Sequence, residues 1–150
     1  MTWIFIVNLS AAWFLTGLIW TIQVIHYPLF GLVGERFCEF EEQHKQRIGF
    51  IVGPTMLAES AAAILLVWYR PAFVSQGAAV AALLLVGVIW ISTATIQAPC
   101  HDRLSQGYDG KIERRLTLSN WIRTIAWTAR ALLLTAALVS GLASAAAISM

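Results

Sequence analysis

The stretch of residues 78–98 reads AAVAALLLVGVIWISTATIQA and contains no charged residue. A segment of about 20 apolar residues is long enough to cross the hydrocarbon core of a bilayer as an α-helix. Three further apolar stretches of similar length lie at 3–27, 48–69 and 121–148. The sequence therefore predicts an all-α integral membrane protein, a four-helix bundle that forms a single transmembrane domain over residues 1–150.

The composition agrees with this class and excludes others. Of the 150 residues, 59% are hydrophobic and only 12% are charged, and the mean hydropathy is +0.72. A soluble domain carries about 25% charged residues. The net charge of +2 comes without any run of basic residues along one face, which argues against a nucleic-acid partner. The expected partner is the lipid bilayer.

The connections between the apolar stretches differ in length and charge. Residues 71–77 form a tight turn, whereas 28–47 and 99–120 are long and polar. The positive-inside rule counts Lys and Arg and places the richer side in the cytoplasm. Only Arg70 lies on the side of the tight turn. We therefore expect an inner-membrane protein of a bacterium with cytoplasmic long loops and both termini outside, the loops carrying Arg36, Lys45, Arg47, Arg103, Lys111, Arg114 and Arg115.

The two cysteines bear on one class of membrane enzyme. In this orientation Cys38 and Cys100 lie on the reducing side of the membrane, and the chain has no C-x-x-C pair. Membrane enzymes that exchange disulfides with quinones need such a reactive pair. The sequence therefore argues against that class.

The chain also contains a short internal repeat. Thr21-Ile22-Gln23 is followed by His26, and Thr95-Ile96-Gln97 is followed by His101. The next helices open alike, with His44 or Asn120 three residues before an arginine. Two parallel repeats of this kind would bring both polar ends to the centre of one bundle. Matches this short arise by chance about as readily, so two similar hairpins remain one of two alternatives.

Each predicted helix carries one stripe of polar or tryptophan side chains at spacings of three and four residues. Residues at these spacings share a helix face, and lipid cannot hydrogen-bond polar groups, so the four stripes should face one another. The interior is then a polar core that is widest at the cytoplasmic end. The stripes are Thr16, Trp20, Gln23 and Tyr27; His44, Ile51, Thr55 and Glu59; Trp90, Thr93, Gln97 and His101; and Asn120, Arg123, Trp127 and Arg130.

Two charges fall well inside the predicted bilayer. At the rise of an α-helix, Glu59 lies about 18 Å deeper than Arg47, and Arg130 lies about 10 Å deeper than Arg123. A lone charge at that depth is costly, so Glu59 and Arg130 are predicted to form an intramembrane charge pair. A structural clamp between two helices and a role in proton relay or ligand binding are equally good explanations.

The three histidines of the chain, His26, His44 and His101, all map to the cytoplasmic end of the predicted helices. Imidazole binds transition metals and haem and transfers protons near neutral pH. We therefore take these histidines as candidate metal ligands, and together with Asn120 and Arg123 as candidate catalytic residues. The alternative is that they are ordinary interface side chains that need no cofactor.

A second group of side chains lies at or near the same level and is of the kind that holds a cofactor or substrate. Amides orient ligands through hydrogen bonds, arginines pair with anionic groups, and tryptophans wall a flat ligand or simply fill a core. The candidate cofactor-binding residues are Gln23, Arg47, Trp90, Gln97 and Trp127.

The segment Asn120-Trp121-Ile122-Arg123-Thr124 opens the last helix after a charged loop. In this motif, in length and in the number of spans, the chain resembles a group of small four-helix membrane proteins that includes the anthrone oxygenases. The resemblance implies oxidation of an apolar aromatic substrate with dioxygen, with Asn120 and Arg123 as active-site residues. In helix count and histidines the chain is also similar to small membrane haem proteins that oxidise porphyrinogens.

These observations lead to one main hypothesis of function and two alternatives. The main hypothesis is a membrane oxidoreductase whose cytoplasm-facing pocket holds a haem, a transition metal or a small apolar aromatic substrate. The alternatives are a small proton-coupled transporter gated by Glu59 and Arg130, and an accessory subunit of a membrane complex. The alanine-rich stretch 129–149 permits close helix contact and suggests a homo-oligomer.

Overall fold

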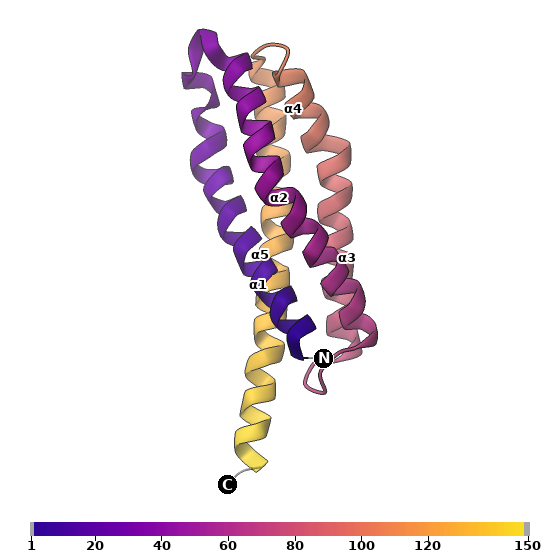
Figure 1. The fold of residues 1–150 in the computed structure, drawn as a ribbon. Helices are drawn as coiled ribbons and strands as arrows, with labels where there is room; N and C mark the ends of the chain where they lie inside the picture. Colours follow the sequence, from indigo (N-terminus) through magenta and orange to yellow (C-terminus); the bar gives the residue numbers. More distant parts are fainter. Residues whose placement is uncertain (1, 149–150) are drawn as a thin grey trace.

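A computed structural model describes residues 2–148, so Met1, Ser149 and Met150 lie outside the described part of the chain. Its regular structure is helical throughout that part, and four helical runs are long and apolar enough to cross a membrane. The runs lie side by side in Figure 1. They cover Thr2–Leu32, Gly34–Trp68, Gln76–Leu104 and Gly110–Ala147.

The first run is an α-helix that changes type before it ends. Helix α1 spans Thr2–Thr21 and passes into the π-helical turn η1, Ile22–His26, and then into the 3-10 helix η2, Tyr27–Leu32. Proline lacks the N–H that would continue an α-helical ladder, and Pro28 lies at the start of η2. Gly34 has a positive φ of 73°, which glycine adopts without steric cost, and it begins the short 3-10 turn η3, Gly34–Arg36.

The second and third runs form a hairpin with a tight turn. Helix α2 spans Phe37–Trp68 and α3 spans Gln76–Ser92. Ser75 caps α3, because its Oγ accepts a hydrogen bond of 3.1 Å from the N–H of Ala78. A second π-helical turn, η4 at Thr93–Gln97, joins α3 to α4, Ala98–Leu104, and the last run is helix α5, Gly110–Ile148.

The long connections expected at 28–47 and 99–120 are largely helical, so the predicted starts at 48 and 121 were too late. Helix α2 begins at Phe37, and α5 begins at Gly110. Apolar length marks only the part of a helix that lies in hydrocarbon. Glu, Gln, Lys and Arg are good helix formers in water, so both helices continue through charged sequence beyond the apolar stretch.

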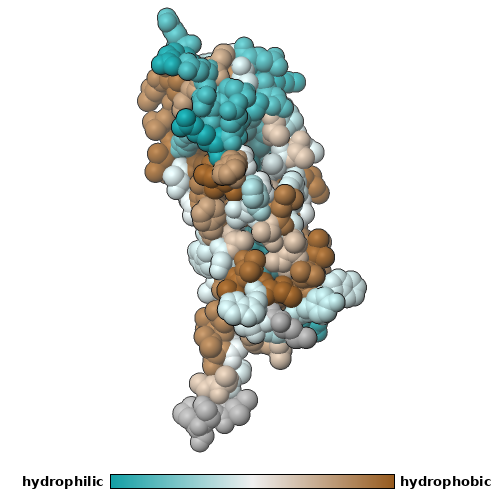
Figure 2. Space-filling model, viewed as in Figure 1, coloured by the Kyte–Doolittle hydropathy of each residue, from teal (hydrophilic) through white to brown (hydrophobic). Residues whose placement is uncertain are grey.

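The helices pack as neighbours around a common interior. Helix α1 contacts α2 and α5, and α3 contacts the same two helices. Both ends of the described chain lie at the end of the molecule that holds the α2–α3 turn (Figure 1). Hydrophilic surface gathers at the opposite end, while brown hydrophobic patches occupy much of the length below it in Figure 2. We call this hydrophilic end the polar end.

Candidate functional site

A cavity of about 310 Å³ lies in the half of the molecule toward the polar end. Its walls come from α2 and from the α3, η4 and α4 run, with contributions from η1, η2 and α5. Most of the lining surface is apolar, and polar side chains from eight of the sixteen lining residues converge on it, as in small-molecule sites. The lining residues are Ile22, Tyr27, His44, Lys45, Ile48, Gly49, Val52, Gly53, Met56, Trp90, Thr93, Gln97, Ala98, His101, Asp102 and Arg123.

Arg123 on α5 is the buried charge of this cavity. Arg123 is only 7% exposed, and its Nε is buried without a hydrogen-bond partner. Within residues 2–148 no carboxylate forms an ion pair with it, and its guanidinium lies over the Trp127 ring at 5.2 Å from the centroid. A buried charge without a counter-charge is costly, so the geometry favours an anionic or carbonyl oxygen in the cavity.

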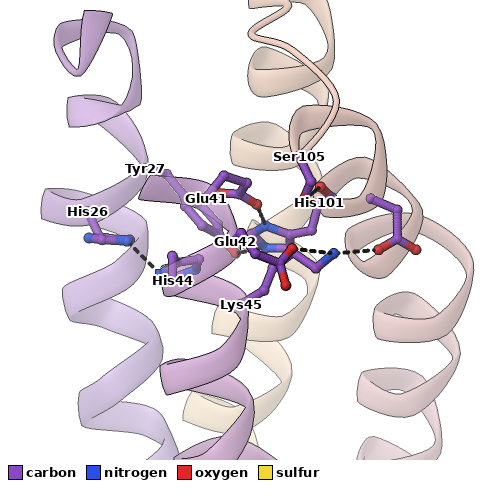
Figure 3. A network of polar contacts seen from close by, with 9 residues as sticks. His26, Tyr27, Glu41, Glu42, His44, Lys45, His101 and Ser105 are labelled. Atoms are coloured by element: carbon purple, nitrogen blue, oxygen red, sulfur yellow. Dashed lines mark hydrogen bonds and ion pairs between the residues drawn. The ribbon is translucent and has the colours of Figure 1, made fainter. Parts of the chain in front are cut away.

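Tyr27 and His101, which line the cavity together with Arg123, belong to a row of three hydrogen-bonded side chains (Figure 3). Tyr27 Oη lies 3.1 Å from His101 Nε2, and His101 Nδ1 lies 2.5 Å from Glu41 Oε1. Glu41 is fully buried, while Tyr27 and His101 both line the cavity. A base whose second nitrogen is held by a carboxylate is the arrangement of general acid–base sites. The hydrogen-bonded side chains of Tyr27, His101 and Glu41 are therefore able to take a proton from a bound molecule.

The other two histidines, His26 and His44, extend this cluster. His26 Nε2 lies 2.8 Å from His44 Nδ1, and the His44 and His101 rings are 5.4 Å apart between centroids. His44 lines the cavity, and His26 packs edge-on against Phe30 at 5.2 Å between ring centroids. The structure therefore brings all three predicted histidines together at the polar end.

The two π-helical turns position the buried amides next to the cavity. Gln23, in η1, accepts a hydrogen bond of 2.8 Å from Asn120 and donates one of 3.1 Å to the Thr117 carbonyl. Gln97, in η4, accepts from Ser92 at 2.9 Å and donates to Ser119 at 3.0 Å. Isolated π-turns within helices occur frequently at functional sites. Turn η4 contains Thr95-Ile96-Gln97, and turn η1 overlaps the other copy of the repeat at Ile22 and Gln23.

The structure separates the predicted residues into three groups. All four residues of the stripe on the third run, Trp90, Thr93, Gln97 and His101, line the cavity, whereas Gln23, Asn120 and Trp127 are buried behind it. Arg47 and Trp20 lie elsewhere. Arg47 lines an exposed hollow with Arg36 and Glu39, and Trp20 packs against Trp121 on the outer face of α1 and α5.

Tyr27 and Glu41 were missing from the predicted site. Tyr27 lay on the polar stripe four residues after Gln23, and this spacing was a usable signal. Glu41 precedes His44 by three residues, which places both on one helix face. The sequence predicts a long polar loop at 28–47, where such spacing has no meaning, so Glu41 gives no signal there.

The geometry gives no support to a metal site. Across the described residues, no group of three or more His, Cys, Asp or Glu side chains is arranged to hold a metal ion. The nearest approach is the histidine cluster, in which His26 and His44 bond to each other and His101 bonds to Tyr27 and Glu41. Metal ligation by His26, His44 and His101 stays a prediction, as does haem binding.

Glu59 and Arg130 lie outside the cavity and bond to each other. Arg130 Nη1 is 2.5 Å from Glu59 Oε1, and both residues are at most 1% exposed. Arg130 also donates to Asn8 and to the Ala82 carbonyl, and Trp127 donates to Glu59 at 3.1 Å. These residues come from α1, α2, α3 and α5. A closed cluster joining all four runs favours a structural clamp over a gate or relay.

The arrangement as a whole is suited to binding a small apolar molecule with one polar oxygen and to moving a proton on or off it. The cavity supplies apolar walls, Arg123 a positive charge, and Tyr27 and His101 a proton acceptor. No family model, no curated protein and no solved structure matches this chain.

Proposed function

We propose that the chain is a membrane-embedded enzyme that oxidises a small apolar aromatic substrate, with Arg123 stabilising negative charge on a substrate oxygen. The observation that carries the proposal is the buried guanidinium of Arg123, which has no counter-ion among residues 2–148 and lines an otherwise largely apolar cavity. Donors fixed in advance toward a developing oxyanion, in a site that excludes water, give a large share of many rate enhancements.

The resemblance to anthrone oxygenases suggests the reaction. The methylene of the central anthrone ring, which lies across that ring from the ketone, loses a proton, and its electron pair shifts through the flanking aromatic rings to the carbonyl oxygen, which faces Arg123. The proton passes through the Tyr27 hydroxyl to His101, and Glu41 stabilises the imidazolium that forms. The enolate then reduces dioxygen. One oxygen atom stays on the carbon as a new ketone and the other leaves as water, which takes up both hydrogens of the methylene.

The experiment is anthrone-dependent oxygen uptake by the purified protein in lipid nanodiscs. Replacing Arg123 with Met removes the positive charge while keeping an apolar side chain, and should lower kcat/KM by about 10²- to 10³-fold, the cost of losing one oxyanion donor. Arg123→Lys should retain part of the activity. Arg47→Met is the matched control, because Arg47 is exposed and outside the cavity.

Two results would contradict the proposal. One is a wild-type protein that takes up no oxygen in the presence of anthrone. The other is an Arg123→Met protein that is as active as Arg47→Met and the wild type, because the charge would then have no role in the reaction.

A further inference from the structure

The cavity lies between two neighbouring helical runs, and its position in that gap bears on how a ligand reaches it. Helix α2 supplies one wall, and α3, η4 and α4 supply the opposite one. Both runs are long and apolar enough to cross a membrane. A gap between two such neighbours, at the level of their apolar segments, faces lipid acyl chains rather than water.

Side-chain bonds between these two walls mark both ends of the gap. Toward the polar end, Lys45 Nζ lies 2.9 Å from Asp102 Oδ1, and Glu41 bonds to His101. Toward the other end, Trp90 Nε1 donates to Ser60 Oγ at 2.8 Å. Between these bonds, no side-chain hydrogen bond or ion pair joins α2 to the α3, η4 and α4 run within residues 2–148.

The walls between the two sets of bonds carry small residues. Gly49 and Gly53 lie one helical turn apart on α2, and Ala98 begins α4 on the other side. A Cβ atom added at Gly49 or Gly53 would meet no atom within 4 Å. The backbone of α2 therefore borders open space there, and Gly49 and Ala98 are both exposed.

We infer that this gap is a lateral entrance from the bilayer, and that the ligand is a membrane-dissolved aromatic molecule bearing one oxygen. A dry cavity of about 150 Å³ holds one benzene ring. The volume of about 310 Å³ therefore suits about two fused rings, or three when the third extends into the entrance. The placement of the oxygen at Arg123 rests on the proposed function. The entrance rests on the side-chain bonds at both ends of the gap and on the glycines between them.

The wild-type protein in nanodiscs provides the first test. A phenyl diazirine that dissolves in the bilayer is photolysed with and without 1-naphthol, a two-ring aromatic alcohol, and labelled residues are mapped by mass spectrometry. We expect label on the segments holding Gly49–Met56 and Trp90–Ala98, and 1-naphthol should lower it there. The groove of Trp20 and Trp121 serves as the internal control, where naphthol should have no effect.

Two labelling results would overturn the inference. Label in the outer groove but none on the cavity segments would mean that the cavity is closed to the bilayer. Label on the cavity segments that 1-naphthol does not lower would mean that the cavity takes lipid chains rather than an aromatic ligand.

A variant provides the second test. Gly49→Leu fills the entrance from a position where a side chain meets no atom, and should raise the Kd for 1-naphthol at least about tenfold, or 1.4 kcal/mol. Gly17→Leu is the matched control, because Gly17 is also exposed on a helix with free space around it but lies outside the cavity. Unchanged binding by Gly49→Leu would overturn the inference.

The two proposals fail differently. If Arg123→Met oxidises anthrone as well as the wild type does, while naphthol binding still depends on position 49, the proposed role of Arg123 is wrong and the entrance stands. If anthrone oxidation depends on Arg123 but Gly49→Leu and the labelling show no effect, the entrance is wrong and the reaction stands. A poorly folded Gly49→Leu protein leaves the decision to the wild-type labelling.

Discussion

Two arginines on α5 are buried to a similar degree but have different surroundings. Arg130 bonds to Glu59, Asn8 and the Ala82 carbonyl, so its charge is neutralised and its donors are used. Arg123, seven residues earlier on the same helix, has an aromatic ring beside it and an unsatisfied Nε. The first arginine is explained by the fold. For the second, we propose that a molecule in the cavity supplies the missing partner.

Tyr27 gives the first prediction at the scale of the residue. Tyr27→Phe removes the hydroxyl that bonds to His101 but keeps the ring, so the proton path is cut while the wall of the cavity remains. We expect kcat for anthrone oxidation to fall by about 10²- to 10⁴-fold, the range for loss of a proton-transfer group. The Kd for 1-naphthol should change little. Tyr108→Phe, an exposed tyrosine outside the cavity, should behave as the wild type in steady-state oxygen uptake.

The Glu59–Arg130 pair gives the second prediction. Arg130→Met leaves Glu59 buried without a counter-charge, and should lower the free energy of unfolding by about 3 to 5 kcal/mol. The double variant Glu59→Met with Arg130→Met should recover most of this loss, because neither charge of the pair is left unpaired. Denaturation in mixed detergent micelles, followed by tryptophan fluorescence, measures both.

A control and a contrary result define this test. Arg36→Met breaks the exposed Arg36–Glu39 pair and should leave unfolding unchanged, since exposed pairs contribute little. An Arg130→Met protein as stable as the wild type would show that the pair does not act as a clamp.

At the scale of the element, α2 combines features that weaken a helix where it borders the cavity. Gly49 and Gly53 lack side chains, and Pro54 lies inside the helix. Proline removes one backbone hydrogen bond and crowds the preceding turn. Larger side chains at positions 49 and 53 would fill the cavity, so the two glycines keep this space open at some expense in helix stability.

Pro54 gives the third prediction. Pro54→Ala restores the missing backbone donor and should raise the free energy of unfolding by up to about 3 kcal/mol, the difference in helix propensity. A more regular α2 should also shift Gly53 and Met56 relative to Trp90 and so weaken 1-naphthol binding. Thermal unfolding and a binding titration on the same sample measure the two effects. A variant whose stability rises with no change in binding would show that the shape of the cavity does not depend on the proline.

The elements also show how far the sequence leads. The four apolar runs and the tight turn before α3 are predicted by the apolar stretches and the short connection between two of them, and the structure has them. The start of α2 at Phe37 could not be predicted, because hydropathy identifies only the part of a helix that lies within the bilayer. Because the predicted helix began at residue 48, Glu41 was not recognised as a residue of the site. The π-turns were also missed, since a stripe read at α-helical spacing assumes that no such turn intervenes.

The candidate site was predicted in part for the same reasons. Spacing found Arg123, Gln97 and His101, because burial of polar groups in lipid leaves them only the interior. Spacing also suggested Trp20, which lies on the outside with its Nε1 donating to Thr128. A tryptophan is equally stable against lipid and against protein, so its place on a polar stripe does not decide which way it faces.

At the scale of the whole molecule, the two ends differ in charge. Charged residues crowd the starts of α2 and α5 at the polar end, whereas Arg70 is the charged residue nearest the α2–α3 turn. Figure 2 shows this hydrophilic cap. We therefore propose that the polar end, with the histidine cluster, faces the cytoplasm.

Cys38 gives the fourth prediction, which tests this orientation. Cys38 is exposed near the polar end, and Cys100 is buried. A membrane-impermeant maleimide should label the protein in inside-out vesicles and fail to label it in right-side-out vesicles or intact spheroplasts. Cys38→Ser should abolish the label, which identifies the reacting thiol. Labelling of Cys38 from the outside would reverse the orientation.

The central claim is that Arg123 stabilises an anionic oxygen in the cavity, and one absorption measurement tests it directly. 1-Naphthol changes its ultraviolet spectrum when its hydroxyl ionises, so a titration with the purified protein near neutral pH reports the form that is bound. We predict that the naphtholate band appears with the wild type and with Arg47→Met, and is lost with Arg123→Met. Bound naphthol that keeps its neutral spectrum in the wild type, or a naphtholate band that persists without Arg123, would contradict the account.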